Sequence, residues 1–214
     1  MAKSRKKRKG QQWVARQNRD PFVKKARQTG YRARAAFKLE QIDQKYHLIH
    51  PQSRVIDLGS APGSWSQYAA SRIRGNHQIV AVDLLPMQDI SGVQFIRGDF
   101  TENAVVQRIL ALLEGHPIDL VLSDMAPNLT GIKATDQARA EVIQDSILGF
   151  CERALKPGGA LVTKLFEGES AIKMRAQLKS LFKQFHVFKP EASRNQSKEI
   201  FLVAREYSGN KRSR

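Results

Sequence analysis

Apolar residues after Pro51 fall into short runs, and stretches with helical spacing separate these runs. The runs predict seven strands, over 54–59, 78–85, 93–98, 118–124, 160–166, 186–189 and 199–206. The stretches between them predict helices near 64–74, 101–114, 135–155 and 170–185. Strands that alternate with helices in this way are typical of a doubly wound α/β sheet with helices on both faces.

The connection before the last strand constrains the direction of that strand. Only eight residues, 191–198, join it to the sixth strand. A parallel crossover needs roughly a dozen residues or more, so we expect the last strand to run antiparallel in a seven-stranded, mostly parallel sheet. Glu199 then lies at the edge formed by the carboxyl ends of the parallel strands, where open α/β sheets bind their ligands.

Two further helices are predicted before the sheet. Asp20 is a candidate N-cap, followed by Pro21 at the first helical position, and the helix runs to Gln28 with Gly30 closing it. A second, basic helix is predicted over 32–46, where apolar residues recur at helical spacing. The basic residues on its other faces are Arg32, Arg34 and Lys38.

Charge changes this picture because it is unevenly distributed. The 214 residues carry a net charge of +16. Residues 1–38 hold 14 Lys and Arg against one acid, residues 211–214 add three bases, and the 19 bases and 19 acids of residues 39–210 cancel. The segregation predicts a neutral core with basic ends that bind a polyanion, although a solvated tail has the same composition. We expect a disordered arm (1–12), one domain (13–207) and a basic tail (208–214).

Composition excludes several classes of function. With 41% hydrophobic and 26% charged residues the chain is typical of a globular protein. It has no apolar run of about 18 residues and no apolar segment after the basic N-terminus, so we expect a cytoplasmic protein without a membrane span. The single cysteine, Cys151, falls on an apolar helical stripe and is expected in the core. The five histidines lack the spacing of a zinc site, so no metal is expected.

Three charged residues are expected to meet at the ligand edge of the sheet. Asp124 ends the fourth strand, Lys164 lies late in the fifth and Glu199 begins the seventh. A lysine in a buried apolar strand is costly unless it is paired. Lys164 therefore either acts at this edge or forms a structural ion pair with Asp124 or Glu199. Lys38, taken alone, is typical of a solvated helix lysine.

The turn after the first strand has the composition of a nucleotide-binding loop. Gly59 and Gly63 allow a tight turn and the close approach of a ligand. The dinucleotide pattern GxGxxG is absent, and Pro62 lacks the N–H that a pyrophosphate requires, so an adenosine ligand without a pyrophosphate is favoured. Asp83, at the end of the second strand, can accept both hydroxyls of a ribose, and Asp99, after the third, can accept an adenine amino group.

Several consecutive motifs resemble the FtsJ/RrmJ family of S-adenosylmethionine-dependent ribose 2'-O-methyltransferases, which includes the bacterial enzyme of large-subunit (23S) ribosomal RNA. The motifs are DLGSAPGSWSQY (57–68), DLLPM (83–87), GDF (98–100), SDMAPNLTG (123–131), LKPGG (155–159) and KPEASRNQSKEIFLVA (189–204). The resemblance covers about residues 13–206 and implies a Rossmann-like methyltransferase fold.

The resemblance also implies the residues of the reaction. The family's Lys-Asp-Lys-Glu tetrad matches Lys38, Asp124, Lys164 and Glu199, with Lys164 as the base that accepts the ribose proton. The residues implied in binding S-adenosylmethionine are Gly63, Trp65, Asp83, Asp99 and Asp124. The implied substrate is a ribose, expected to be that of a uridine, in the large ribosomal subunit. A monomer that acts without a membrane and without a metal is expected.

Other functions fit parts of the sequence. A nicotinamide dehydrogenase is disfavoured by the missing GxGxxG pattern. A non-catalytic RNA-binding assembly factor explains the basic arm but not a lysine in an apolar strand. Relatives that methylate transfer RNA or a messenger cap share the tetrad, and the tail motif favours the ribosomal enzyme. In each RNA-binding case Arg32, Arg34 and Arg194 are expected to contact phosphates.

Overall fold

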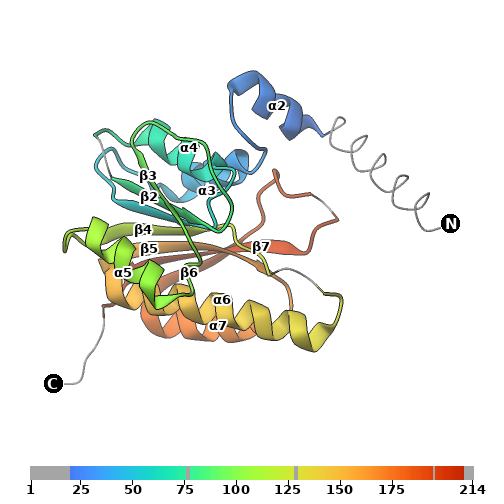
Figure 1. Ribbon diagram of the computed structural model, residues 1–214. Helices are drawn as coiled ribbons and strands as arrows, with labels where there is room; N and C mark the ends of the chain where they lie inside the picture. Colours follow the sequence, from blue (N-terminus) through green and yellow to red (C-terminus); the bar gives the residue numbers. More distant parts are fainter. Residues whose placement is uncertain (1–19, 76–77, 128–129, 195, 210–214) are drawn as a thin grey trace.

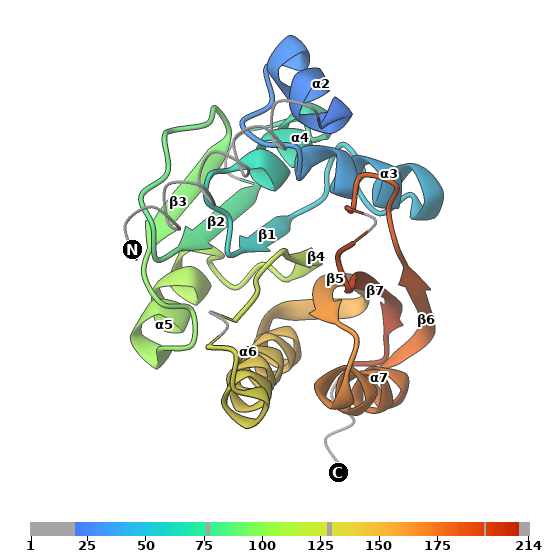
Figure 2. The same cartoon turned by 90° about the vertical axis from the view of Figure 1, so that its right-hand side faces the viewer.

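The computed structural model describes residues 20–75, 78–127, 130–194 and 196–209, so the predicted basic arm and the bases at 211–214 lie outside the described residues. Seven strands form one sheet in the order β3-β2-β1-β4-β5-β7-β6 (Figures 1 and 2). They are β1 (Val55–Leu58), β2 (Ile79–Asp83), β3 (Val93–Arg97), β4 (Ile118–Ser123), β5 (Leu155–Phe166), β6 (Phe182–Phe188) and β7 (Glu199–Tyr207). Strands β1 to β5 pair in parallel, whereas β7 is antiparallel to both β5 and β6. The predicted sheet is confirmed, including the direction of its last strand.

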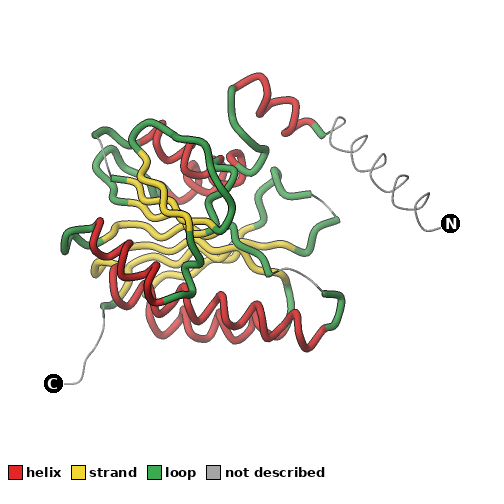
Figure 3. Tube along the Cα trace, in the orientation of Figure 1, coloured by secondary structure: helices red, strands yellow, loops and turns green. Residues whose placement is uncertain are grey.

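Helices cover both faces of the sheet (Figure 3). They are α2 (Pro21–Thr29), α3 (Ala36–Tyr46), α4 (Ser64–Arg72), α5 (Asn103–Leu112), α6 (Lys133–Ala154) and α7 (Glu169–Leu181). Successive strand residues point to opposite faces. Ile56 and Leu58 pack in a core with residues of α5, α6 and α7, whereas Val55 packs with residues of α3 and α4. Cys151 is fully buried in the first of these cores, as predicted, and burial raises the pKa of its thiol.

Two strands, β5 and β6, begin earlier than the sequence predicts. Strand β5 begins at Leu155 instead of 160, and β6 begins at Phe182 instead of 186, which shortens α7. The apolar residues Leu178, Phe182 and Phe185 keep a helical spacing and suggested a longer helix. Pairing of Phe182 with Tyr207 of β7 places this segment in the sheet, so backbone hydrogen bonds to β7 override the local pattern.

The N-terminal segment packs against α3 and the loop between β6 and β7. Asp20 accepts hydrogen bonds from the first turn of α2, and Gly30 ends the helix in a left-handed conformation, as predicted. Helix α3 begins at Ala36 instead of 32, and most of its residues are buried. The prediction of a second helix is confirmed in its apolar stripe but corrected at its start, because Arg32 and Arg34 precede α3 and only Lys38 of the three named basic residues lies on it. Helix α3 is part of the second core, whereas α2 stands out from the body of the described residues (Figure 1).

Candidate active site

Two ion pairs lie at the carboxyl end of the parallel strands. Lys164 Nζ is 2.9 Å from Asp124 Oδ1, and it also donates to the main-chain oxygen of Asp124. Lys38 Nζ lies 2.9 Å from Glu199 Oε1 and donates to Oε2 at 3.0 Å. The two pairs touch, because Lys38 Nζ is 4.0 Å from Asp124 Oδ1. The structure thus brings together all four residues that the sequence pattern and the resemblance named.

The pairing of β5 with β7 places two of these side chains. Lys164 lies opposite Phe201, and Glu199 lies opposite Phe166, so both reach the same edge from antiparallel strands. Lys38 reaches this edge from α3, and its Nζ lies 5.5 Å from the centre of the Phe201 ring. Its side chain is only 11% exposed, which corrects the expectation of a solvated helix lysine.

Charge neutralisation explains how two lysines share this edge. Burial raises the pKa of Glu199, but the adjacent Lys38 and a hydrogen bond from Lys38 outweigh burial and leave the pKa below its usual value. Glu199 is therefore an anion whose close partner is Lys38. The close partner of Lys164 is Asp124, which selects one of the two ion pairs that the sequence left open.

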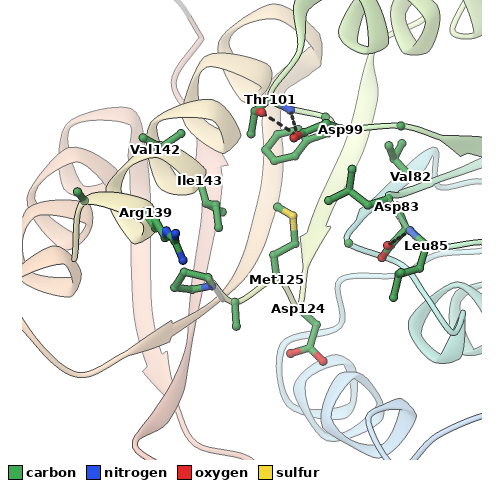
Figure 4. Close-up of a pocket in the computed structure, with 17 residues that line it drawn as sticks. Val82, Asp83, Leu85, Asp99, Thr101, Asp124, Met125, Arg139, Val142 and Ile143 are labelled. Atoms are coloured by element: carbon green, nitrogen blue, oxygen red, sulfur yellow. Dashed lines mark hydrogen bonds between the residues drawn. The ribbon is translucent and has the colours of Figure 1, made fainter. Parts of the chain in front are cut away.

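A cavity of about 860 Å³ opens beside this charged cluster (Figure 4). Asp83 ends β2, Asp99 follows β3 and Asp124 follows β4, and all three line the cavity, as their positions at the ends of successive strands predicted. Asp124 belongs to both the cavity and the ion pair with Lys164. A smaller hollow of about 30 Å³ next to the cavity includes Lys164 and shares Met125 as a lining residue.

Two of the cavity's carboxylates are oriented by backbone groups. Asp83 Oδ2 accepts from Ala61 N at 2.9 Å, and its Oδ1 accepts from Leu85 N at 2.8 Å. Asp99 Oδ1 accepts from the N–H and the hydroxyl of Thr101. Each carboxylate oxygen has further lone pairs. The two carboxylates can therefore accept hydrogen bonds from a ligand with hydroxyl, amino or cationic groups.

The structure places Gly63 and Trp65 differently from the carboxylates. Neither lines the cavity. Gly63 caps α4 with φ +102°, and the indole of Trp65 is buried, with Nε1 donating to Ala35 O at 2.8 Å. The expectation that the Trp65 side chain lines the pocket is not met, because its length and apolar surface are used in packing α4 on α3. Its backbone remains at the start of α4.

The turn itself requires glycine at Gly59. Its φ is +75°, and a Cβ there would lie 2.1 Å from Met125 Cγ. Beneath the turn, Asp57 is fully buried and accepts from Ser66 Oγ at 2.6 Å. Burial raises the pKa of Asp57 to about 7. Its Oδ1 has no hydrogen-bond partner among the described atoms.

Met125 and Arg139 are among the cavity residues that the sequence did not indicate. Met125 adjoins Asp124, and Arg139 on α6 points toward the cavity in Figure 4. Arg139 precedes Ile143 by four residues and so shares a helical face with a residue of the core and the cavity. That spacing could have indicated from the sequence that Arg139 faces the cavity.

Two features are absent from the described part of the chain. Within it, no helix is long and apolar enough to cross a bilayer. The same residues contain no group of three or more His, Cys, Asp or Glu side chains that is arranged to hold a metal ion.

Comparisons with known proteins agree with this site. Residues 31–207 match the family model described as FtsJ-like methyltransferase. The chain is 47% identical to a Ribosomal RNA large subunit methyltransferase E of Bordetella parapertussis, over 91% of this chain and 95% of that protein. It is 46% identical to the protein of the same name from Alkalilimnicola ehrlichii, over 94% and 97%.

Solved structures show the same architecture. A chain described as a ribosomal RNA methyltransferase of Plasmodium falciparum has a TM-score of 0.73 and 28% identity, over 84% of this chain and 100% of that one. Human Methyltransferase-like protein 13, solved with SAH, has a TM-score of 0.58 at 16% identity, over 79% and 81%, and supports the fold alone. With the match over 31–207, these findings confirm the resemblance seen in the sequence. The chain therefore belongs to the FtsJ-like methyltransferase family of S-adenosylmethionine-dependent enzymes.

Proposed function

We propose that this protein methylates a ribose 2'-hydroxyl, that of a uridine, in 23S ribosomal RNA of the assembled large subunit. The observation that carries the proposal is the ion pair between Asp124, which lines the large cavity, and Lys164, which lines the adjoining hollow. The names of the bacterial relatives support large-subunit ribosomal RNA as the substrate. A dehydrogenase has no use for this pair, and a non-catalytic RNA-binding factor has no use for the cavity.

The residues around the cavity fit S-adenosylmethionine. We assign the ribose diol to Asp83 and the adenine amino group to Asp99, since both carboxylates line the cavity and keep acceptor capacity. Asp124 faces the end of the cavity next to Lys164, where the cationic part of the ligand is attracted to a carboxylate. Gly63 and Trp65 contribute their backbone at the start of α4, a helix terminus that favours a carboxylate.

The chain's own residues then act on the ribose. When bound, S-adenosylmethionine supplies an electrophilic methyl group. Lys164, once its ammonium group has released a proton to solvent, accepts the proton of the 2'-hydroxyl, so that the ribose oxygen becomes the nucleophile. Asp124 holds the Lys164 amine in place through two of its oxygens. The Lys38–Glu199 pair orients the substrate at the same edge and keeps the cluster close to neutral.

Domain organisation and partners complete the proposal. We assign residues 13–207 to the methyltransferase domain, residues 20–46 to RNA binding and the basic ends to phosphate contacts. The enzyme acts as a monomer in the cytoplasm, where large subunits are assembled. The distribution of charge supports the assignment of phosphate contacts to the basic ends, because the bases are concentrated outside the neutral catalytic part.

Methyl transfer to isolated large subunits tests the proposal. Lys164→Ala lowers the rate by at least about 100-fold, because it removes the proton acceptor, while affinity for S-adenosylmethionine is retained. Asp83→Ala has the opposite signature: it weakens cofactor binding by about 2 kcal/mol through the loss of charge-assisted hydrogen bonds. Near wild-type turnover of Lys164→Ala at saturating cofactor and RNA would refute the role of Lys164.

A further inference from the structure

Arg32 is bonded within the protein, although the sequence suggested a phosphate contact. It lies between α2 and α3, and its guanidinium donates to three main-chain oxygens. Nη1 donates to Pro62 O at 3.0 Å and to Gln88 O at 2.8 Å, and Nη2 donates to Asp89 O at 2.8 Å. One side chain thus satisfies acceptors in two separate loops.

These two loops flank the carboxylate assigned to the cofactor ribose. Pro62 belongs to the turn between β1 and α4, and Gln88 and Asp89 belong to the loop that follows Asp83. Asp83 itself joins the same turn, because its Oδ2 accepts from Ala61 N. Arg32 therefore links the two loops a second time. It binds the turn at Pro62, the residue after Ala61, to which Asp83 is bonded.

The space around Arg32 is filled on the side of the turn. A Cβ at Gly63 would lie 2.8 Å from Arg32 Nη1 and 2.7 Å from Met87 Sδ. The backbone of Arg32 is also fixed, since its N–H donates to Gln67 Oε1 at 3.0 Å and Gln67 Nε2 donates to Gly30 O at 2.8 Å. Gln67 of α4 thereby holds the backbone of Arg32 in place.

We propose that Arg32 is a positioning residue for S-adenosylmethionine: it holds the turn at Pro62 and the loop at 88–89 at the separation that Asp83 needs to take the ribose diol. The inference rests on the proposed function, in which Asp83 binds that diol. Only arginine meets this geometry, because its planar fork presents several fixed donors, whereas lysine carries one flexible ammonium. The segment assigned to RNA thus also shapes the cofactor site.

The lysine replacement separates positioning from phosphate binding. Arg32→Lys keeps the positive charge and removes the fork, and Arg32→Ala removes both. We expect both variants to raise the Kd and KM for S-adenosylmethionine by about tenfold, the equivalent of one lost hydrogen bond to a charged group, with kcat close to wild type. Gln67→Ala, which loosens the backbone of Arg32, is expected to act in the same direction. Lys183→Ala removes an exposed charge on β6 and is the matched control.

The measurements are calorimetry with S-adenosylmethionine and the salt dependence of RNA binding, on variants with unchanged thermal unfolding. The proposal expects Arg32→Lys to lose cofactor affinity while its RNA salt slope equals that of wild type. Wild-type cofactor affinity in Arg32→Lys together with a lower salt slope in Arg32→Ala would overturn it and make Arg32 a phosphate contact. Wild-type cofactor affinity in all three variants would overturn it as well. Failure of the wild-type protein itself to bind S-adenosylmethionine would instead refute the proposed function.

Discussion

At the scale of single residues, the main feature of the site is that two lysines lie at one buried edge of the sheet. An unpaired charge in this environment costs several kcal/mol. Each lysine has a carboxylate within 3 Å, and Asp124, the partner of Lys164, also lies 4.0 Å from Lys38 Nζ and so links the two pairs. The arrangement leaves the Lys164 amine fixed next to a cavity, while the cluster has no large net charge.

Removing one partner of the Lys38–Glu199 pair should cost more than removing both. Lys38→Met and Glu199→Gln each leave a group without its buried partner, so each is expected to lower the free energy of unfolding by about 3 kcal/mol. The double variant should lose clearly less than the sum, yet methyl transfer should stay impaired in all three. Urea unfolding of the wild type, the two single variants and the double variant measures this double-mutant cycle, with Lys183→Met as the exposed control. Strictly additive losses of unfolding free energy would show that the two side chains do not interact.

The raised pKa of Asp57 predicts how the stability of the protein depends on pH. Its pKa is about 7 in the folded protein, mainly through burial, against 3.8 for an ordinary Asp. The folded state therefore binds this proton more tightly than the unfolded state, so its contribution to stability is complete below about pH 4 and is lost as pH rises to 7. The loss is at most about 1.4 kcal/mol per pH unit.

Asp57→Asn keeps an acceptor for Ser66 and cannot ionise. We expect its free energy of unfolding to fall less steeply than that of wild type between pH 4 and 7. Urea titrations at several pH values measure the two slopes, and Asp145→Asn, at an exposed position on α6, is the control. Equal slopes for Asp57→Asn and wild type would contradict a raised pKa at this position.

At the scale of elements, the sheet was predictable because its strands are short, buried and apolar, whereas some boundaries were not. The start of β6 was missed because Leu178, Phe182 and Phe185 fit a helix as well as a strand, and only pairing with β7 decides between them. The burial of Lys38 was missed for a related reason: it depends on α3 packing against β7, which brings together residues far apart in the sequence.

The contacts of the basic residues near α2 likewise depend on tertiary packing and could not be predicted from the sequence. Arg34 pairs with Asp20 and donates to Ala192 O, and Arg194 lies 3.7 Å from Asp20 Oδ2. With Arg32 they were expected to contact RNA, but all three bind groups of the chain itself. Charge counting finds a basic segment, but it cannot tell which bases are used to join α2 to the β6–β7 loop.

RNA phosphates are therefore left to other bases of the N-terminal segment. Deleting residues 1–10 removes six Lys and Arg and is expected to flatten the salt dependence of RNA binding, by about 0.7 in the log–log slope for each phosphate that the shortened protein no longer binds. Affinity for S-adenosylmethionine should not change, because the cavity is lined by residues between 59 and 143. Filter binding over a range of salt concentrations checks this, and equal slopes for the full-length and shortened proteins would mean that the arm binds no phosphate.

At the scale of the whole molecule, the charged edge of the sheet combines four parts of the chain. The ends of β4, β5 and β7 and the first turn of α3 supply one side chain each, and β2 and β3 add the cavity's other carboxylates. The strand-end residues were predictable because the carboxyl ends of parallel strands share one edge of the sheet. The pairing of Lys38 with Glu199 and the hydrogen bonds of Arg32 to two loops depend on tertiary packing that no local pattern encodes.

The central claim is that Lys164 makes this edge a ribose 2'-O-methyltransferase site for large-subunit RNA. The most direct test is to map 2'-O-methyl groups on 23S ribosomal RNA from cells that lack the protein and then regain either the wild type or Lys164→Ala. We expect one uridine to be unmethylated without the protein, methylated with the wild type and unmethylated with Lys164→Ala at equal protein level. Restoration of the methyl group by Lys164→Ala, or no difference in 23S RNA between cells with and without the protein, would contradict the claim.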